Sequence, residues 1–280
     1  MSISIVIPAH NEATVIDRCL RSIVSSAVPG ELDVVVVCNG CSDETANIAR
    51  RFGAPVRVIE TEVASKPHAL NLGDRSANGF PRFFIDADVI VPLESVRRIA
   101  RALATGPILA AAPRIKSDFA GCSWAVRAYH KVWMNLPYVQ NCMLGAGVYA
   151  LSEAGRARFD RFPDMIADDE FVRMQFSSEE KASLEDAHFI FIPPHTFGAL
   201  IHINVRRYVG ALDMRRLFPE AAARDARLRR GALLRLALRP PFWPSLAVYA
   251  GAKACTLALF VWRKSRGAEK RWARDPTSRE

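Results

Sequence analysis

The chain has 280 residues, half of them hydrophobic, which suffices for one large α/β domain with an appendage and excludes a largely disordered protein. Its formal net charge of +9 is uneven, because 18 of the 38 Lys and Arg residues but only 6 of the 29 Asp and Glu residues follow His202. A basic end on a near-neutral body favours an anionic surface as the partner. We expect a membrane and not nucleic acid, because no zinc-finger spacing or RNA-binding signature is present.

The first 112 residues alternate predicted strands with predicted helices. Strands are expected at 2–7, 32–37, 56–59, 82–85 and 108–112, and helices at 13–26, 42–51, 65–76 and 93–105. Short links between such elements predict a doubly wound, mostly parallel, Rossmann-like sheet. Ligands bind beyond the carboxyl ends of the strands in these sheets, and polar clusters at 10–12, 39–43 and 86–88 follow three strands. One shared site is therefore expected at this edge.

After Pro113 the regular alternation stops. We expect a helix over 124–136, a strand over 145–151, a helical stretch ending near 176 and a strand over 189–192. The first eight residues have no basic segment and their apolar run has the length of a strand, so they do not form a signal peptide. The body of the protein is therefore expected in the cytosol.

Asp86 and Asp88 form the first candidate site. Two carboxylates at i and i+2 after a buried strand can hold Mg²⁺ or Mn²⁺, which take few protein carboxylates and leave room for phosphate oxygens. Such a metal neutralises charge on a leaving diphosphate. The alternative is a strand-end turn with two solvated aspartates.

Two further polar clusters suit a nucleotide. The segments 8–12 and 38–45 end adjacent strands, where polar groups can contact a nucleobase and ribose, although Asn11 and Asp43 are also ordinary helix caps. Lys66, near the start of a predicted helix, can meet a phosphate as a point charge, or it is simply an exposed lysine.

The acidic run Asp168, Asp169 and Glu170 is the candidate for proton transfer. Three adjacent carboxylates repel one another, so at least one is expected to have a raised pKa if it is partly buried. A general base for a sugar hydroxyl requires such a group within hydrogen-bonding reach. The alternative is an acidic first helical turn that the helix dipole favours.

Together, the order and spacing of these motifs over about residues 2–208 resemble the inverting glycosyltransferases of family two, which have the GT-A fold. The segment 8–12 resembles the family's P-A-x-N-E, and 66–73 resembles its K-x-x-A-L-N-x-G. The segment 39–45 resembles D-G-S-x-D-x-T, with Asn39 replacing an acid and Cys41 a serine. Asp86-Ala87-Asp88 resembles the family's metal motif, and 167–169 stands where the family has its E-D pair.

The resemblance implies a role for each matching position. It implies donor-binding positions at Pro8, Ala9, Asn11, Glu12, Asn39, Asp43, Lys66, Asn71, Asp86 and Ala87. Among these, Pro8, Glu12 and Asn39 would line the nucleoside pocket, Lys66 would approach the diphosphate or ribose, and Asp86 would lie near the ribose.

The remaining positions divide between the metal and the acceptor. Mn²⁺ or Mg²⁺ would be held by Asp88 with Asp86, and His202 is a further candidate ligand that can equally be a structural histidine. Asp169 would be the base, with Asp168 and Glu170 as alternatives. Positions on the acceptor or diphosphate side would be Gly145, Gly147, Arg206 and Arg207.

These implications define the expected domains and partners. We expect a domain over 1–208, with a nucleotide-binding half of about 1–112 and an acceptor half of about 113–208, followed by a basic, apolar, helical region over 209–280. The expected substrates are a nucleoside-diphosphate sugar and a hydroxyl acceptor. A soluble acceptor and a non-catalytic nucleotide-sugar-binding module are the alternatives.

The C-terminal region carries the expectation of membrane contact. The segment 242–262 is nearly apolar, has Trp243 and Trp262 at its ends and is followed by basic residues, but Lys253 lies in its middle. A helix lying in the interface, a tilted or re-entrant insertion and a buried core helix all fit. We favour peripheral or monotopic attachment to the cytoplasmic face, since aromatic ends and flanking arginines suit lipid headgroups. A lipid-linked or membrane-held acceptor follows from this region alone.

Overall fold

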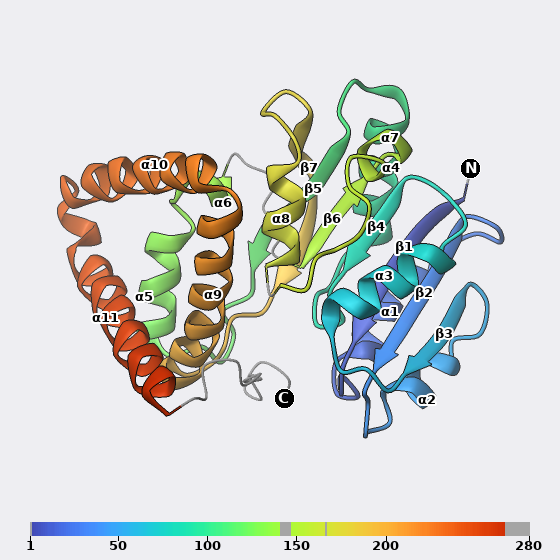
Figure 1. The fold of residues 1–280 in the computed structure, drawn as a ribbon, viewed down its shortest axis with the longest axis horizontal. Helices are drawn as coiled ribbons and strands as arrows, with labels where there is room; N and C mark the ends of the chain where they lie inside the picture. The colour runs from blue at the N-terminus through green and yellow to red at the C-terminus, as the bar shows by residue number, and fades with distance from the viewer. Residues whose placement is uncertain (1, 141–146, 166, 267–280) are drawn as a thin grey trace. The chain divides into compact units, whose positions relative to one another are not determined.

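The computed structural model describes residues 2–140, 147–165 and 167–266, which fall into two compact units. Residues Met1–Lys116 and Asn141–Phe191 make up the first, the sheet unit. Residues Ser117–Gln140 and Ile192–Glu280 make up the second, the helical unit. Each unit is described by itself below, with its elements labelled in Figure 1.

The sheet unit alternates strands and helices along its first half, as the sequence predicts. Its strands are β1 (Ile3–Ala9), β2 (Leu32–Asn39), β3 (Val56–Thr61), β4 (Arg82–Ile85), β5 (Ala110–Ser117), β6 (Val148–Leu151) and β7 (Lys181–Phe191). Its helices are α1 (Ile16–Val24), α2 (Thr45–Arg50), α3 (Lys66–Ser76), α4 (Leu93–Thr105), α7 (Glu153–Arg156) and α8 (Asp168–Met174).

Within the described residues the strands form one seven-stranded sheet in the order β3-β2-β1-β4-β6-β5-β7. β1 pairs in parallel with β2 and β4, with Ile7 opposite Val36 and Val6 opposite Phe84. β6 enters antiparallel between β4 and β5. The predicted α/β class with a mostly parallel sheet is therefore confirmed.

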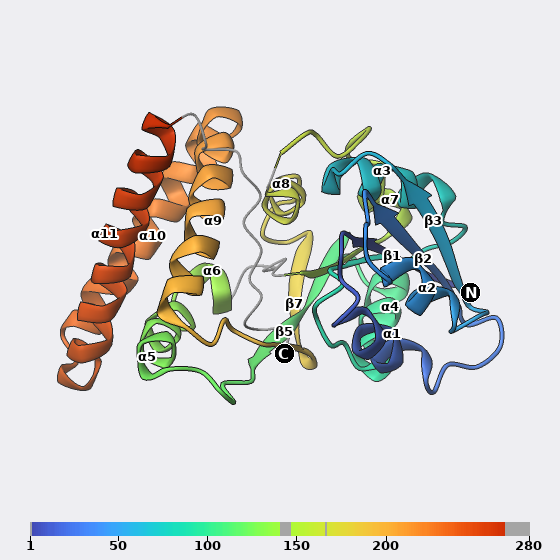
Figure 2. The ribbon, with the colours of Figure 1, turned by 90° about the horizontal axis from the view of Figure 1, so that it is seen from below.

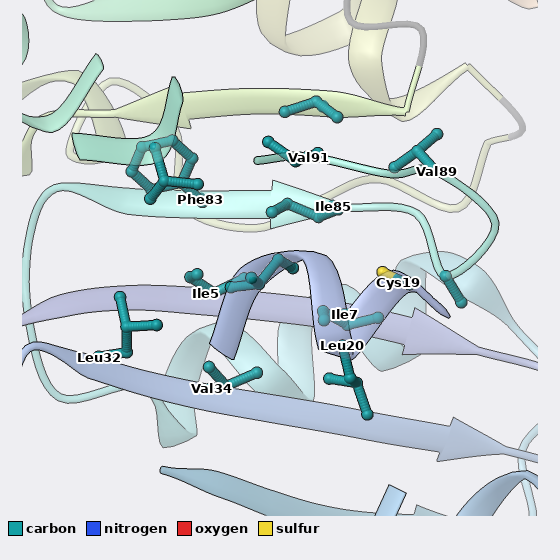
Figure 3. Close-up of a cluster of buried hydrophobic side chains, with 14 of the residues drawn as sticks. Ile5, Ile7, Cys19, Leu20, Leu32, Val34, Phe83, Ile85, Val89 and Val91 are labelled. Carbon is teal, nitrogen blue, oxygen red and sulfur yellow. The ribbon is translucent and has the colours of Figure 1, made fainter. Parts of the chain in front are cut away.

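One face of the sheet carries the larger core. Side chains that alternate along β1, β2 and β4 point to this face and pack against α1 and α4, because their branched apolar residues are buried there. Figure 3 shows part of this cluster, which includes Ile5, Ile7, Cys19, Leu20, Val34, Phe83 and Ile85. Figure 2 shows α1 and α4 on one side of the parallel strands and α3 on the other.

The opposite face is covered by α3 and α8. Val6 and Phe84 pack there with Leu70 of α3 and with side chains of α8. α3 approaches the sheet closely at Gly73, where an added Cβ would lie 2.4 Å from Cγ1 of Val6. Only glycine therefore allows α3 to lie this close to β1.

The helical unit consists of helices that pack on one another. It contains α5 (Trp124–Trp133), α6 (Pro137–Gln140), α9 (Phe197–Leu217), α10 (Pro219–Ala237), a 3₁₀ turn (Pro240–Phe242) and α11 (Trp243–Ser265). α11 packs on α5 and α9. Its buried side chains are Ser245, Tyr249, Ala252 and Thr256, so the polar stripe of this apolar helix faces its neighbours.

The exposed side of the same helices is apolar and basic. Leu234 and Leu238 near the end of α10 are 70% and 83% exposed, and Trp243, Leu257, Val261 and Trp262 of α11 are also exposed. In the described part of the chain, residues Pro240–Ser265 form the one helix long and apolar enough to cross a membrane, with a mean hydropathy of 1.5. Only 28% of its most apolar stretch is buried.

Several element ends differ from the sequence predictions by a few residues, and two boundaries differ more. The last strand, expected over 189–192, begins at Lys181. The sequence prediction started too late because the first part of β7, at the sheet edge, is half-exposed and lacks apolar alternation. The expected domain boundary at residue 208 falls inside α9, which is one continuous helix. Residues 117–140 and 192–208, expected in the acceptor half, belong to the helical unit because they pack with its helices.

Candidate active site

Three charged side chains of the sheet unit meet at the carboxyl end of β4. Lys66 Nζ lies 2.7 Å from Asp86 Oδ1 and 3.0 Å from Asp168 Oδ1. Asp86 directly follows β4, while Lys66 and Asp168 are the first residues of α3 and α8. α3 begins at this point because the Ser65 side chain accepts a hydrogen bond from the His68 amide. Local structure therefore brings together charges from three separate segments.

The carboxylates determine the charge state of the lysine. Burial by itself would lower the pKa of Lys66, but the carboxylates of Asp168 and Asp86 outweigh burial and hold that pKa above its ordinary value. Asp86 keeps 35% of its side chain exposed, whereas Asp168 keeps 4%. Of these two carboxylates, Asp86 is therefore the one that a ligand can reach from solvent.

The two adjacent aspartates at the start of α8 have different surroundings. Burial raises the pKa of Asp168, and the Lys66 ammonium opposes this effect. Burial also raises the pKa of Asp169 to about 7, where the neighbouring Asp168 carboxylate adds to the effect and Lys66 reduces it. Asp168 is thus engaged by the lysine, while Asp169 changes its charge near neutral pH. Such a carboxyl can accept a proton under physiological conditions.

Tyr149 of β6 is a site residue that the sequence did not reveal. Its hydroxyl donates a hydrogen bond of 3.4 Å to Asp168 Oδ2, and burial and the nearby aspartates hold its pKa well above the ordinary value. It therefore remains a donor that orients Asp168. Its strand is uniformly buried, with no polar alternation to mark the position, and only the antiparallel pairing with β4 brings it here.

Asp88 lies in the turn after β4, two residues beyond Asp86. Burial of the Cys19 thiol is the main cause of its raised pKa, and the carboxylates of Asp88 and Asp86 raise that pKa further. Both carboxylates therefore lie close to this part of α1. Ala87 between them is buried in the core. Ala87 thus anchors the turn in the core, while the carboxylates of the residues before and after it, Asp86 and Asp88, stay partly exposed.

The chemistry of this turn fits a hard divalent cation that a substrate would help to bind. No cluster of three or more His, Cys, Asp or Glu side chains suited to a metal occurs among the described residues. Mg²⁺ commonly uses only one or two protein carboxylates and completes its coordination with phosphate oxygens and water. Two strand-end carboxylates, both partly exposed to solvent, meet that requirement.

The loops after β1 and β2 are tied to each other by hydrogen bonds. Asn11 Nδ2 donates to Ser42 Oγ at 3.1 Å, and the Ser42 amide donates to Asn11 Oδ1 at 2.7 Å. The Ala13 amide donates to Asp43 Oδ2 at 3.2 Å, and the Glu12 amide donates to Thr45 Oγ1 at 2.7 Å. Asn11 and Asp43 therefore join the two loops to each other, and neither is the N-cap of the following helix, because Val15 and Glu44 hold those positions without a side-chain cap bond.

The other predicted donor residues occupy the same sheet edge. Pro8 and Ala9 are buried at the end of β1, and Asn39 is buried at the end of β2. The carbonyl oxygen of Asn39 contacts Nδ1 of His10 at 2.5 Å. The two strand ends are therefore adjacent, as expected for a single pocket.

Asn71 and Gly147 position other parts of the site. Asn71 Nδ2 donates to the Phe162 carbonyl at 2.9 Å, and the Phe162 amide donates to Asn71 Oδ1 at 2.9 Å, so the amide holds a loop. The Gly147 carbonyl accepts a hydrogen bond of 2.7 Å from the Asp86 amide. Gly147 has a φ of +92°, and an added Cβ would lie 3.3 Å from Asp86 Cβ. Gly145 lies outside the described residues.

The remaining candidates, His202, Arg206 and Arg207, lie on α9 in the helical unit. His202 is exposed, and its Nδ1 lies 2.6 Å from Nη2 of Arg263 on α11. Its role as a metal ligand stays a prediction, as do the roles of the two arginines toward a diphosphate.

Solved structures of glycosyltransferases share this fold. A mannosyltransferase from Pyrobaculum calidifontis, in complex with GDP-Man and Mn²⁺, has a TM-score of 0.59 and 20% identity, covering 95% of this chain and 83% of that chain. Glucosyl-3-phosphoglycerate synthase from Mycobacterium tuberculosis, with Mn²⁺, UDP-glucose and glycerol 3-phosphate, has a TM-score of 0.55 and 23% identity, covering 77% and 79%. At such identities the likeness shows the fold alone, and it confirms the expected GT-A-like architecture.

Curated relatives match over a shorter stretch. A 4,4'-diaponeurosporenoate glycosyltransferase from Staphylococcus aureus is 39% identical over 92 residues, which are 31% of this chain and 24% of that protein. Glycosyltransferase AglE from Haloferax volcanii is 35% identical over 91 residues, which are 31% and 30%. The matched stretch thus spans less than a third of either relative. The family model described as "Glycosyl transferase family 2" matches residues 4–158, more than half of the chain, and the chain belongs to that family.

Proposed function

We propose that this protein transfers a sugar from a nucleoside-diphosphate sugar to a hydroxyl group of a membrane-held acceptor, with inversion at the anomeric carbon. The contact of Lys66 with both Asp86 and Asp168 carries the proposal, because it brings the strand-end carboxylates and the acidic start of α8 into one site. Family membership and the fold support the reaction class.

The donor occupies the carboxyl edge of β1, β2 and β4 in this proposal. The loops joined by Asn11 and Ser42 form the nucleoside side, with Pro8, Glu12 and Asn39 lining it. Asp86 and Asp88 would hold Mn²⁺ or Mg²⁺, which when bound neutralises charge on the diphosphate leaving group. Lys66 adds a positive charge beside Asp86.

The start of α8 supplies proton transfer. Asp169 removes the proton from the acceptor hydroxyl as that oxygen attacks the anomeric carbon in line with the departing diphosphate. Its raised pKa of about 7 makes it a stronger base than an ordinary aspartate and leaves it substantially ionised at neutral pH. Asp168 is paired with Lys66 and bonded to Tyr149, so it positions the lysine and stabilises its charge.

The helical unit supports the membrane-held acceptor. Its exposed leucines, valine and tryptophans lie beside arginines on α10 and α11, a combination that favours the headgroup region of an anionic bilayer. The polar stripe of α11 is buried against neighbouring helices, which favours attachment at the surface over a span. We place this surface at the cytoplasmic face.

A donor-binding screen tests the proposal directly. The melting temperature of the full chain is measured with a panel of nucleoside diphosphates and their sugars, with and without Mn²⁺, because a ligand of the folded state raises it. We expect one nucleotide to stabilise the chain more with Mn²⁺ than without. In a transfer assay with membrane lipid extract, we expect the corresponding nucleoside-diphosphate sugar to give up its sugar to a lipid. Stabilisation that is equal with and without Mn²⁺ would contradict the metal assignment, and no nucleotide effect at all would contradict donor binding.

A further inference from the structure

In the helical unit, cationic side chains surround a pair of stacked tyrosines. Tyr129 of α5 and Tyr249 of α11 stack with ring centroids 5.0 Å apart. Lys253 Nζ lies 5.8 Å from the Tyr129 centroid and 5.3 Å from that of Tyr249. Arg207 Cζ of α9 lies 5.6 Å from the ring of Trp133, one turn after Tyr129 on α5. Contacts between three helices therefore place these two cations in one region.

The charges of this region are not balanced. The packed helices partly desolvate the Lys253 ammonium while part of its side chain stays exposed, and this desolvation, with the guanidinium groups of Arg229 and Arg207, lowers the pKa of Lys253 to about 8. Within residues 2–140, 147–165 and 167–266, no salt bridge joins any of these three cations to a carboxylate. These like charges repel one another, so the region has a positive potential that an anion would relieve.

An amide donor lies beside the same cations. Asn204 is one turn before Arg207 on α9, and its Oδ1 accepts a hydrogen bond of 3.2 Å from the Tyr129 hydroxyl. Asn204 is only 3% exposed, and its Nδ2 has no partner among the described residues. A buried N–H without an acceptor is costly, so this donor also favours an oxygen-rich ligand.

An exposed apolar track begins at the lysine. Leu257 and Val261 lie one and two turns beyond Lys253 on the same side of α11 and are 49% and 56% exposed. Lys253 and Arg207 are themselves exposed, so the region is reachable from solvent. An alkyl chain along these residues would place a charged headgroup at the Lys253 ammonium.

We propose that Asn204, Arg207 and Lys253, the cationic cluster, bind the phosphate group of a phosphorylated amphiphile whose chain lies along Leu257 and Val261. A guanidinium, an ammonium and an amide N–H match the charge and the several oxygens of a phosphate monoester better than those of a single carboxylate. The binding goes beyond the proposed sugar transfer and does not depend on it. A free phosphate ester offers the same headgroup chemistry without the chain.

Calorimetry on the full chain in a non-ionic detergent with EDTA tests this site. The probes are inorganic phosphate, hexyl phosphate and hexyl glucoside, and EDTA prevents metal-dependent binding elsewhere. We expect hexyl phosphate to bind at least tenfold more tightly than inorganic phosphate, and hexyl glucoside not to bind. Equal affinity for the two phosphates would overturn the amphiphile and leave a free-phosphate site, and an absence of phosphate binding would overturn the site.

Variants locate the binding. Lys253→Met is expected to weaken hexyl phosphate binding about tenfold, since a charge-assisted hydrogen bond is lost, whereas Lys264→Met at the exposed end of the same helix should leave it unchanged. Without phosphate, Lys253→Met should melt at a higher temperature than the parent chain, because the repulsion from Arg207 and Arg229 is removed. Unchanged phosphate affinity in Lys253→Met would refute the cluster.

A second variant separates this site from the donor site. Arg207→Gln should weaken hexyl phosphate binding as Lys253→Met does, with Arg215→Gln on the same helix as its control. Asp88→Ala should retain full hexyl phosphate binding. Loss of donor binding in Asp88→Ala with phosphate binding intact, and the reverse pattern in Lys253→Met, would show that the two proposals stand or fall separately.

Discussion

The ammonium of Lys66 lies 3.0 Å from Oδ1 of Asp168, which joins the first residue of α3 to the first residue of α8 by an ion pair. The same ammonium contacts Asp86, so its charge is shared between a residue of the turn after β4 and a residue beside the predicted base. Its removal is therefore expected to change the proton affinity of α8 as well as the donor side.

The pH dependence of turnover tests this coupling. The raised pKa of Asp169 predicts that kcat/KM increases with pH and levels off above about pH 7, because only the ionised carboxylate accepts a proton. Lys66→Met should move the rising part of the pH profile of kcat/KM to higher pH, since the positive charge that lowers the Asp169 pKa is lost. Lys116→Met, an exposed lysine of β5, is the control and should leave the profile in place. A rising part that stays near pH 7 in Lys66→Met would contradict the coupling.

The identity of the base is tested by replacing each of the three acidic residues, one at a time, by the corresponding amide. Asp169→Asn is expected to bind the donor normally and to lose transfer by about 10³-fold or more, because proton transfer is removed. Glu170→Gln should keep most activity, since Glu170 is half-exposed and pairs with Arg173. If Asp168→Asn alone behaves as a base variant, with donor affinity retained, the base is one residue earlier.

Asp169→Asn is also expected to change the stability of the chain. The pKa of Asp169 is higher in the folded than in the unfolded chain, so the folded state binds the proton more tightly and the free energy of unfolding falls as pH rises from about 4 to 7. Asp169→Asn should therefore match the parent chain below about pH 4 and exceed it by about 1–3 kcal/mol above pH 7. Urea unfolding at both pH values measures the difference, and equal stability at pH 8 would contradict the burial of this carboxyl.

The metal assignment depends on the turn after β4. Asp88→Ala should abolish the Mn²⁺-dependent part of nucleotide binding and reduce transfer by at least 10²-fold, because the principal carboxylate ligand is removed. Asp186→Asn, a 62% exposed acid that pairs with Arg98, is the matched control and should leave both unchanged. Unaltered Mn²⁺ dependence in Asp88→Ala would end the assignment.

Gly147 allows β6 to approach Asp86. Gly147→Ala combines a strained φ of +92° with a Cβ 3.3 Å from Asp86 Cβ and 3.0 Å from Val89 Cγ1. We expect a loss of about 1–3 kcal/mol in the free energy of unfolding and a weaker donor affinity, because Asp86 must shift. Gly30→Ala is the control, because Gly30 has a φ of +80° and open space around it, so this variant introduces backbone strain without a steric contact. Equal donor affinity in the two variants would show that Gly147 does not position Asp86.

Attachment to lipid is expected to follow the exposed apolar residues of the helical unit. Replacing Leu234, Leu238 and Trp262 together by Gln should reduce cosedimentation with vesicles of anionic phospholipid at least severalfold, because apolar area is lost from the bilayer interface. Val28→Gln and Val63→Gln, which alter exposed valines of the sheet unit, are the controls. Undiminished cosedimentation of the triple variant would contradict the assigned surface.

Sequence periodicity predicted the parallel half of the fold well, because buried strands and amphipathic helices leave local patterns. Residues 82–85 and 93–105 match β4 and α4 at both ends. The partners of the site residues leave no such pattern. Tyr149 reaches Asp168 only through an antiparallel pairing, and Lys66, expected beside a phosphate, is engaged by two carboxylates. The first half of β7 was missed because it is half-exposed at the sheet edge.

Gly73 lies two helical turns from Lys66, about 10 Å along α3. Because the helix backbone rests on Val6 and Val37 at that glycine, any larger side chain would lift the helix and carry the lysine with it. The alignment of the charged centre is thus set from a distance by a residue without a side chain. Changing only the residues that line the pocket would leave the position of α3, and so of Lys66, as it is. A substitution beneath Gly73 in the interior of the sheet unit would shift that position and so alter donor preference.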